Sequence, residues 1–343
     1  MNTRQIALED ELLASAWERY PAQHLDDYLV RGVEDPRINA QSILTRGLIL
    51  DILFPGRFTR EIDSEIRFGV VLTWILRELE SHRDRSRLLE DIANGTDSSI
   101  PGIVTETYCW LQVAGAPVAD YITQALNFQN PDDPAQLLNP VTLDTFMEFW
   151  RSHLPDCNQP RPSILEVACG SANDYRFLCA SGISDHINYE GIDISEKNVA
   201  NALRRHPEAR FVQGSILSSG IADASFDYVF AHDLIEHLSP SAMDRAVEEM
   251  ARMSRREVWI HLFRATEDCD HIIAPEPPYH WNTISTSLLS RQFSANGFDT
   301  EVLFVGKWLS GKFSIGEHYN PRAATLIASR QVVRQYHHLR PQC

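Results

Sequence analysis

One acidic residue is followed by small residues at every second position in one short stretch of the chain, between an apolar segment and an amphipathic one. The stretch runs from Ser163 to Leu178 and reads Ser-Ile-Leu-Glu-Val-Ala-Cys-Gly-Ser-Ala-Asn-Asp-Tyr-Arg-Phe-Leu. Its apolar start, 163–167, predicts a short buried β-strand, and Asn173 opens a predicted helix. The small residues between them let a ligand come close to the backbone, where N–H groups at a helix N-terminus face it. The pattern therefore predicts a nucleotide-binding corner.

The order of the small residues selects among nucleotide-binding loops. A dinucleotide-binding loop would read G-x-G-x-x-G. Here Glu166 ends the strand, and small residues follow at every second position, at Ala168, Gly170 and Ala172. This alternation resembles the first motif of class I S-adenosylmethionine (SAM) methyltransferases. Two of the three glycines of that motif are alanine here, so we expect the turn to avoid positive φ at both alanines.

A second acid ends the next predicted strand. Asn188-Tyr-Glu-Gly-Ile-Asp193 leads into a helix for which Ser195 is the expected N-cap. In a parallel nucleotide-binding sheet, Asp193 would accept hydrogen bonds from a ribose diol, although such an acid can also serve only as a helix cap. The resemblance implies a cofactor-binding set of Glu166, Ala168, Gly170, Asn173, Asp193, Ile194, Gly214, Ser215, Ile216, His232 and Asp233.

The order of the remaining segments is that of the same family. Further strands are expected at 210–214, 226–230, 257–263, 300–305 and 323–328, with a helix at 241–254. The resemblance covers residues 139–330 and implies an α/β fold, the Rossmann-like seven-stranded sheet of class I methyltransferases. We therefore assign residues 139–343 to a SAM-binding domain.

Residues 1–138 are expected to form an all-helical domain. The segments 43–54 and 68–79 are apolar almost all round, and such helices are buried in a bundle or in a subunit interface. Further helices are expected at 6–19, at 105–126 and, at the joint between the domains, from Asn139 to Arg151. The N-terminal region is thus a candidate lid, substrate wall or homodimer interface.

Composition narrows the classes of partner. The net charge is −16 and no Lys/Arg-rich run is present, which argues against nucleic acid and anionic membranes as partners. No apolar run is long enough to span a bilayer, and the N-terminus lacks the apolar core of a signal peptide. Six scattered cysteines without a C-x-x-C pair favour reduced thiols in a cytoplasmic protein.

The cofactor leaves the reaction open, because the sulfonium of SAM activates three carbons and positioning decides which of them reacts. Methyl transfer to a small molecule is the default of the fold. Its acceptor pocket would include His237, Tyr279, His280 and Trp281, although Trp281 can equally pack and His280 can cap a helix. The candidate bases are His232, His237, His261, His271 and His280.

A metal-assisted variant of methyl transfer is an alternative that we disfavour. Asp233, Glu236 and His237 would share one face of a helix, and His261 or His280 would complete a set of oxygen and nitrogen ligands. The cluster resembles the E-x-x-E-H motif of metal-dependent O-methyltransferases. Many metal-free relatives keep such a Glu-His pair for structure, so we expect no metal.

The second reaction is cyclisation of SAM to azetidine-2-carboxylate and methylthioadenosine, which we slightly favour. The chain resembles bacterial azetidine-2-carboxylate synthases, enzymes of secondary metabolism, at two positions. The resemblance implies that the ring of Tyr175 lies against the sulfonium and that Asn139 holds the amino-acid part of SAM. The alternatives are a core contact for Tyr175 and a helix cap for Asn139. A SAM-binding protein without activity is a third, weaker reading.

Overall fold

The computed structural model describes residues 2–19, 39–80, 85–113, 150–156, 160–277, 279–330 and 336–339. Asn139 lies outside these ranges, as does most of the helix expected after it, of which 150–153 are seen as helical. The helix expected at 105–126 is described only as far as residue 113. Among the described residues, no helix combines the length and apolarity that a membrane span requires.

Seven strands form the main sheet, in the order β10-β11-β5-β4-β1-β2-β3. All run parallel to one another except β11, which is antiparallel to both of its neighbours. The strands are β1 (Ser163–Val167), β2 (Asn188–Asp193), β3 (Arg210–Gln213), β4 (Phe226–His232), β5 (Ser254–Leu262), β10 (Asp299–Phe304) and β11 (Ala324–Ser329). The order reverses at β1, so the carboxyl ends of β1 and β4 meet where doubly wound sheets bind nucleotides. The predicted fold class is confirmed.

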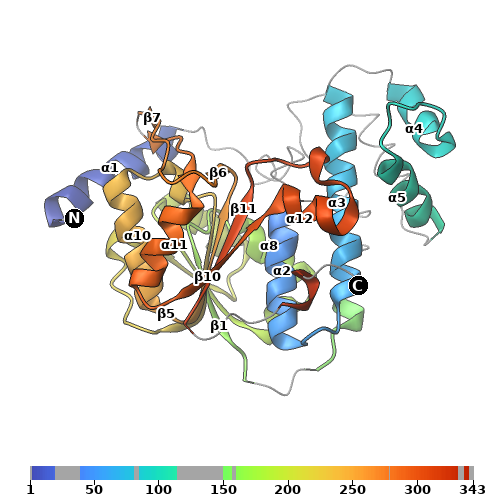
Figure 1. Cartoon of the computed structure of the whole chain (residues 1–343). Helices are drawn as coiled ribbons and strands as arrows, with labels where there is room; N and C mark the ends of the chain where they lie inside the picture. Colours follow the sequence, from blue (N-terminus) through green and yellow to red (C-terminus); the bar gives the residue numbers. More distant parts are fainter. Residues whose placement is uncertain are drawn as a thin grey trace.

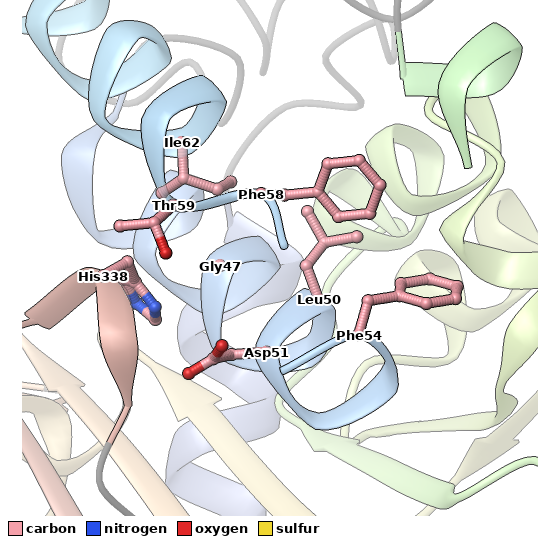
Figure 2. Close-up of a pocket in the computed structure, with 8 residues that line it drawn as sticks. All are labelled: Gly47, Leu50, Asp51, Phe54, Phe58, Thr59, Ile62 and His338. Atoms are coloured by element: carbon pink, nitrogen blue, oxygen red, sulfur yellow. The ribbon is translucent and has the colours of Figure 1, made fainter. Parts of the chain in front are cut away.

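Helices lie on both faces of this sheet (Figure 1). The described α-helices are α1 (Thr3–Arg19), α2 (Ala40–Leu53), α3 (Thr59–Glu80), α4 (Arg85–Asn94), α5 (Gly102–Val113), α8 (Asn173–Ala180), α9 (Glu196–Arg205), α10 (Pro240–Met253), α11 (Thr286–Ala295) and α12 (Val305–Phe313). Serine side chains cap the N-termini of α9, α10 and α11, and the predicted cap Ser195 is among them.

Short elements complete the description. The 3₁₀ helices are η3 (Ile183–His186), η4 (Ile216–Ser218), η5 (Ile235–His237), η6 (Gly316–His318) and η7 (His337–Leu339). Two-residue strands form the pairs β6 (Ala265–Thr266) with β9 (Ile284–Ser285) and β7 (Pro275–Glu276) with β8 (Tyr279–His280). These pairs follow β5 and border the carboxyl edge of the sheet.

Side chains alternate between two hydrophobic cores along each strand. In β1, Ile164 joins the core beneath α2, α3, α8 and α12, whereas Leu165 joins the core beneath α10 and α11. Helix α2, although it comes from the N-terminal region of the chain, therefore packs on the first of these two faces of the sheet. Thirteen of its fourteen residues are buried, as its all-round apolar sequence predicts.

The predicted division of the chain at residue 138 falls outside the described residues and stays a prediction. The described contacts show α2 and the sheet sharing one core. Helices α4 and α5 lie beyond α3, away from the sheet (Figure 1).

Candidate active site

The loop between β1 and α8 takes the left-handed backbone conformation at every second residue. The φ angles are 57° at Ala168, 55° at Gly170 and 68° at Ala172. The expectation that both alanines avoid positive φ is therefore wrong. Alanine carries the smallest side chain that meets this strain, which costs about 1–2 kcal/mol per residue. Backbone hydrogen bonds within the loop and to β2 hold it there, from Cys169 N–H to Ile192 O and from Ala172 N–H to Cys169 O.

Asp193 at the end of β2 is tied to this loop. Its Oδ2 accepts a hydrogen bond from Gly170 N–H at 2.9 Å, and its Oδ1 accepts bonds from Ser195 N–H at 2.8 Å and the Asn198 side chain at 3.2 Å. Oδ2 keeps one acceptor direction, since a carboxylate oxygen has two lone pairs. A side chain added at Gly170 would meet no atom within 4 Å, so the loop is open on that side.

Three carboxylates surround the corner, on Glu166, Asp174 and Asp193. Glu166 is 3% exposed and accepts a hydrogen bond from Tyr189 Oη at 2.5 Å. Burial raises the pKa of Glu166 well above its ordinary value, and the charges of Asp174 and Asp193 raise it further. Burial also raises the pKa of Asp193, although the hydrogen bonds that this carboxylate accepts lower it in part. A cationic ligand would relieve this repulsion, and SAM carries a sulfonium and an ammonium group.

The remaining predicted cofactor residues line the same edge. Asn173 opens α8, and its side-chain Oδ1 is buried with no hydrogen-bond partner among the described residues. Such an acceptor fits an ammonium or hydroxyl donor of a ligand. At the adjacent strand ends, Gly214 follows β3 and donates its N–H to Asp193 O, and Ile194 accepts from Gln213. The residues present therefore fit SAM.

Helix α1 reaches the predicted adenine position. Ser215 donates its hydroxyl to Asp10 of α1 at 2.5 Å, and Ile216 beside it is 7% exposed and forms an apolar wall. A second contact of α1 joins Glu9 to Ser239 at 2.6 Å. The N-terminal helix thus lies along the carboxyl edge of the sheet, at the site where the predicted lid would act.

Two histidines at the ends of β4 and β5 share one hydroxyl group of α2. Thr45 Oγ1 lies 2.9 Å from His232 Nε2 and 2.9 Å from His261 Nε2. The other ring nitrogen of His261 lies 3.0 Å from Thr325 Oγ1, and His232 Nδ1 lies 3.4 Å from Asp174 Oδ2. Burial lowers the pKa of both imidazoles, so both are neutral near neutral pH.

His232 has a different neighbour at each ring nitrogen. Thr45 Oγ1, beside Nε2, carries one hydrogen that it can donate to Gln41 O at 3.1 Å or to one of the two imidazoles, so these contacts fit either tautomer of each ring. The Asp174 carboxylate beside Nδ1 would stabilise the imidazolium form of His232, which is the arrangement of a base next to a group that stabilises its protonated form.

Tyr175 lies behind the loop, in an aromatic cluster. It is 6% exposed, and its ring lies 4.3 Å from that of Tyr189, with His206 and Phe211 on other sides. These are the neighbours of a core residue, which was the alternative to a place against the sulfonium. Asn139, its predicted catalytic partner, lies outside the described residues.

The predicted substrate residues gather at the carboxyl edge beyond β5. The ring of His237 lies 5.5 Å from that of Tyr279 and 5.2 Å from that of Trp281, and Phe263 lies against both His237 and Trp281. Trp281 is 38% exposed. His280 contributes its backbone oxygen, 3.1 Å from His237 Nδ1.

The ligand set of the metal-assisted variant is not assembled. Glu236 is fully buried, and its Oε1 accepts hydrogen bonds from Phe263 N–H at 2.8 Å and Arg264 N–H, so it fixes the chain after β5. His237 bonds the His280 backbone, and His261 bonds threonines on the α2 face. The searched part of the chain holds one group of potential metal ligands, and it contains none of these residues.

Sequence reasoning missed Thr45, Asp174, Thr325, Phe263 and Asp10. Asp174 and Phe263 adjoin motifs that were recognised, so their positions carried a local signal. The other three residues come from distant segments, and the pattern of the sequence does not place them at the site.

The parallel strands, the single antiparallel β11 and the acid-flanked loop at the β1 switch point define a SAM-binding α/β fold of the class I methyltransferase type. Residues 164–257 match a family described as "Methyltransferase domain". Residues 164–257 therefore form a domain of the methyltransferase type, and a domain of this type indicates an enzyme that uses SAM.

Solved structures with significant similarity include the YcgJ protein of Bacillus subtilis, with 18% identity, 49% of this chain and 91% of that chain covered, and a TM-score of 0.36. A SAM-dependent methyltransferase of Methanosarcina mazei has 15% identity, 50% and 93% coverage, and a TM-score of 0.39. The 1,6-didemethyltoxoflavin-N1-methyltransferase of Burkholderia thailandensis has 14% identity, 64% and 88% coverage, and a TM-score of 0.39. No curated protein matches the sequence significantly. Because these TM-scores are low, the assignment of the fold rests on the strand order and on the domain match.

Proposed function

We propose that the enzyme cyclises SAM to azetidine-2-carboxylate and releases methylthioadenosine, a reaction suited to bacterial secondary metabolism. When bound, SAM supplies both partners of this reaction, its α-amine as nucleophile and its γ-carbon as electrophile. A bond forms between the amine nitrogen and the γ-carbon as the bond from that carbon to sulfur breaks. The sulfur keeps the electron pair as a neutral thioether, and the amine loses its ammonium proton.

The observation that carries the proposal is the closure by α2 of the carboxyl ends of β4 and β5 and of the amino end of β11, which lies beside them. The Gln41 side chain donates to Leu262 O at 3.1 Å and to Ala324 O at 3.0 Å. One turn further along α2, Thr45 joins His232 and His261. Gln41, Thr45 and His261 are each at most 5% exposed. The chain's own helix thus covers strand ends beside which a separate acceptor would bind, and cyclisation needs no acceptor.

The base that the reaction requires is His232. Its imidazole takes up the ammonium proton, and the Asp174 carboxylate, 3.4 Å from Nδ1, stabilises the imidazolium that forms. Thr45 and His261 hold the ring on its other side. Burial raises the pKa of Glu166 and of Asp193, and the cationic SAM would favour the ionised form of both carboxyl groups more than its neutral thioether product does.

The roles proposed for Asn139 and Tyr175 rest on the resemblance to azetidine-2-carboxylate synthases. Asn139 would hold the amino-acid part of SAM. Tyr175, buried against Tyr189, would act through the position of α8 and the loop before it rather than by touching the sulfonium in the conformation described.

Methyl transfer to a small molecule is the second candidate, and a group of aromatic side chains beyond β5 favours it. The rings of His237, Phe263, Tyr279 and Trp281 pack against one another beyond β5, and Trp281 is partly exposed. A planar acceptor would stack there. In this reaction His232 would deprotonate the acceptor, and the product would be S-adenosylhomocysteine.

Incubation of the purified full-length chain with SAM alone, followed by mass spectrometry, separates the candidates. Cyclisation predicts methylthioadenosine and azetidine-2-carboxylate in equal amounts. Methylthioadenosine with homoserine lactone would contradict it, because attack by the SAM carboxylate on the same carbon gives those products without the enzyme. Turnover that starts only after an acceptor is added, with S-adenosylhomocysteine as product, would also contradict it.

A further inference from the structure

Three potential metal ligands meet at the edge of the sheet opposite the candidate active site. Cys179 lies near the end of α8, His206 caps the C-terminus of α9, and Glu208 leads into β3. The Cys179 Sγ lies 4.0 Å from His206 Nδ1, which lies 3.3 Å from Glu208 Oε1. All three ligand atoms lie within 4.8 Å of one another. The connections after α8 and α9 are at the amino ends of β2 and β3, so this group is distinct from the SAM corner.

The spacing is close to that of a tetrahedral zinc site. Zn²⁺ binds sulfur at about 2.3 Å and nitrogen or oxygen at about 2.0–2.1 Å, so tetrahedral ligands are separated by about 3.3–3.6 Å. The distance from His206 to Glu208 has this value already, and the distance from Cys179 to His206 needs to shorten by about 0.5 Å. A rotation of the Glu208 side chain, which is 59% exposed, brings in its carboxylate.

The surroundings favour a cation. Two α-helices, α8 and α9, end at the group, and the carbonyl ends of helices carry partial negative charge. Burial raises the pKa of the Cys179 thiol, hydrogen bonds with Ser184 and Tyr175 lower it, and the nearby carboxylates of Glu208 and Asp185 raise it further. Burial lowers the pKa of His206, the Glu208 carboxylate raises it, and the positive charges of Arg205 and Arg176 lower it. A bound divalent cation would remove the cost of ionising the thiol, because the thiolate is the metal-ligating form.

We propose that Cys179, His206 and Glu208 bind Zn²⁺ or another borderline divalent cation, with a water molecule as the fourth ligand. A thiolate, an imidazole and a carboxylate are a ligand set that selects such ions over Mg²⁺ or Ca²⁺. The ion would join the end of α8 to the connection between α9 and β3. His206 also meets the Tyr175 ring edge-on at 5.1 Å, so a bound ion would fix the aromatic cluster that packs α8 onto β2.

Titration of the metal-free full-length protein with Co²⁺ tests this site directly. A thiolate bound to Co²⁺ gives a charge-transfer absorption band in the near ultraviolet. We expect the band to saturate at one ion per chain and to disappear when Zn²⁺ is added. The band should be lost in Cys179→Ser and weakened at least tenfold in apparent affinity in Glu208→Gln.

The exposed cysteines provide matched controls. Cys109→Ser and Cys269→Ser should keep the band, since both residues are exposed and lie in other parts of the chain. Circular dichroism of metal-free Cys179→Ser shows whether the variant is folded, and in a variant that is not folded the Glu208→Gln result decides. Absence of the band in the unaltered protein, or its persistence in folded Cys179→Ser, would overturn the proposal.

Discussion

Two regions of the candidate active site are built in different ways. The corner after β1 is local in sequence: small residues at 168–172 form a strained loop, and Asp193 of the next strand holds it by the Gly170 N–H. The cover formed by α2 is assembled from distant segments: Thr45 meets His232 and His261, and Gln41 meets Leu262 and Ala324. We propose that the corner binds the cofactor and that the cover restricts which groups can react with it.

The difference separates the class of ligand from the choice of reaction. Backbone geometry and carboxylates support the proposal that the corner binds a cationic nucleoside, and one βαβ unit supplies all of them. In the proposed function, the choice between cyclisation and methyl transfer depends on side chains of α2, and α2 shares one core with the sheet. Substitutions in the corner should therefore alter SAM affinity, and substitutions in the cover should alter turnover.

The largest effect is expected from Asp193→Ala. This change removes an acceptor for ribose and leaves the donors of Gly170, Ser195 and Asn198 without their partner. We expect SAM affinity to fall about 100-fold, or ~3 kcal/mol, since hydrogen bonds to charged groups are involved. Calorimetric titration measures it, with Asp223→Ala as a control on an exposed acid. Equal affinities of Asp193→Ala and the unaltered chain would mean that the corner does not hold the ribose.

Thr45→Val should separate the cover from the corner. It removes the hydroxyl that joins His232 and His261 with almost no change in volume. We expect turnover to fall about tenfold or more, with SAM affinity nearly unchanged, because only the position and protonation of the base are altered. The pH dependence of turnover should shift as well. Thr73→Val is the matched control, because the Thr73 hydroxyl is buried without a hydrogen-bond partner among the described residues.

If Thr45→Val and Thr73→Val reduced turnover equally, the loss would come from packing and not from the histidine pair. Unchanged turnover in Thr45→Val would remove the pair from the mechanism.

Much of the corner could be predicted from the sequence, because its information is local. The bounds of β1 and β2, the start of α8 at Asn173 and the cap Ser195 agree with the pattern of apolar and capping residues. The conformation of Ala168 and Ala172 could not be predicted from residue type. Surrounding hydrogen bonds override the intrinsic preference of alanine, and they become visible only with β2 in place.

The cover could be predicted only as buried helix. The all-round apolar sequence of α2 indicates burial but does not name the surface that it meets. The pairing of Thr45 with His261 spans most of the chain, and a single sequence contains no signal for such a contact. Glu236 and His237 show the converse, because their spacing is typical of metal ligands whereas their side chains contact the backbone of the segments that follow β5.

Glu236→Gln should change how stability depends on pH. Burial and the Asp233 charge raise the pKa of Glu236 to about 8, from an ordinary value of 4.5. A raised carboxyl pKa means that the folded chain holds the proton more tightly, so this group lowers stability as pH rises from about 4.5 towards 8. The loss has a limit of about 1.4 kcal/mol per pH unit. The free energy of unfolding of Glu236→Gln should lack this loss, because the amide keeps the acceptor for Phe263 N–H without a charge.

Denaturant unfolding at several pH values measures this effect, with the exposed Glu267→Gln as control. Parallel pH profiles for Glu236→Gln and the unaltered chain would contradict the assignment.

The smallest effect is expected from Ala172→Gly. Glycine relieves the left-handed strain at φ 68° but increases the freedom of the unfolded chain and removes a fully buried methyl group. We expect these contributions to offset each other within ~1 kcal/mol, with SAM affinity preserved. A much larger loss, measured by thermal unfolding, would show that the alanine methyl is required for packing of the loop.

Isothermal calorimetry of the purified chain with SAM tests most directly whether the β1 corner binds a sulfonium nucleoside. The structure predicts one molecule of SAM bound per chain, with affinity that rises with pH as Glu166 and Asp193 lose their protons. The absence of binding heat under conditions in which the chain is folded, with buffers of different ionisation enthalpy compared, would contradict the account.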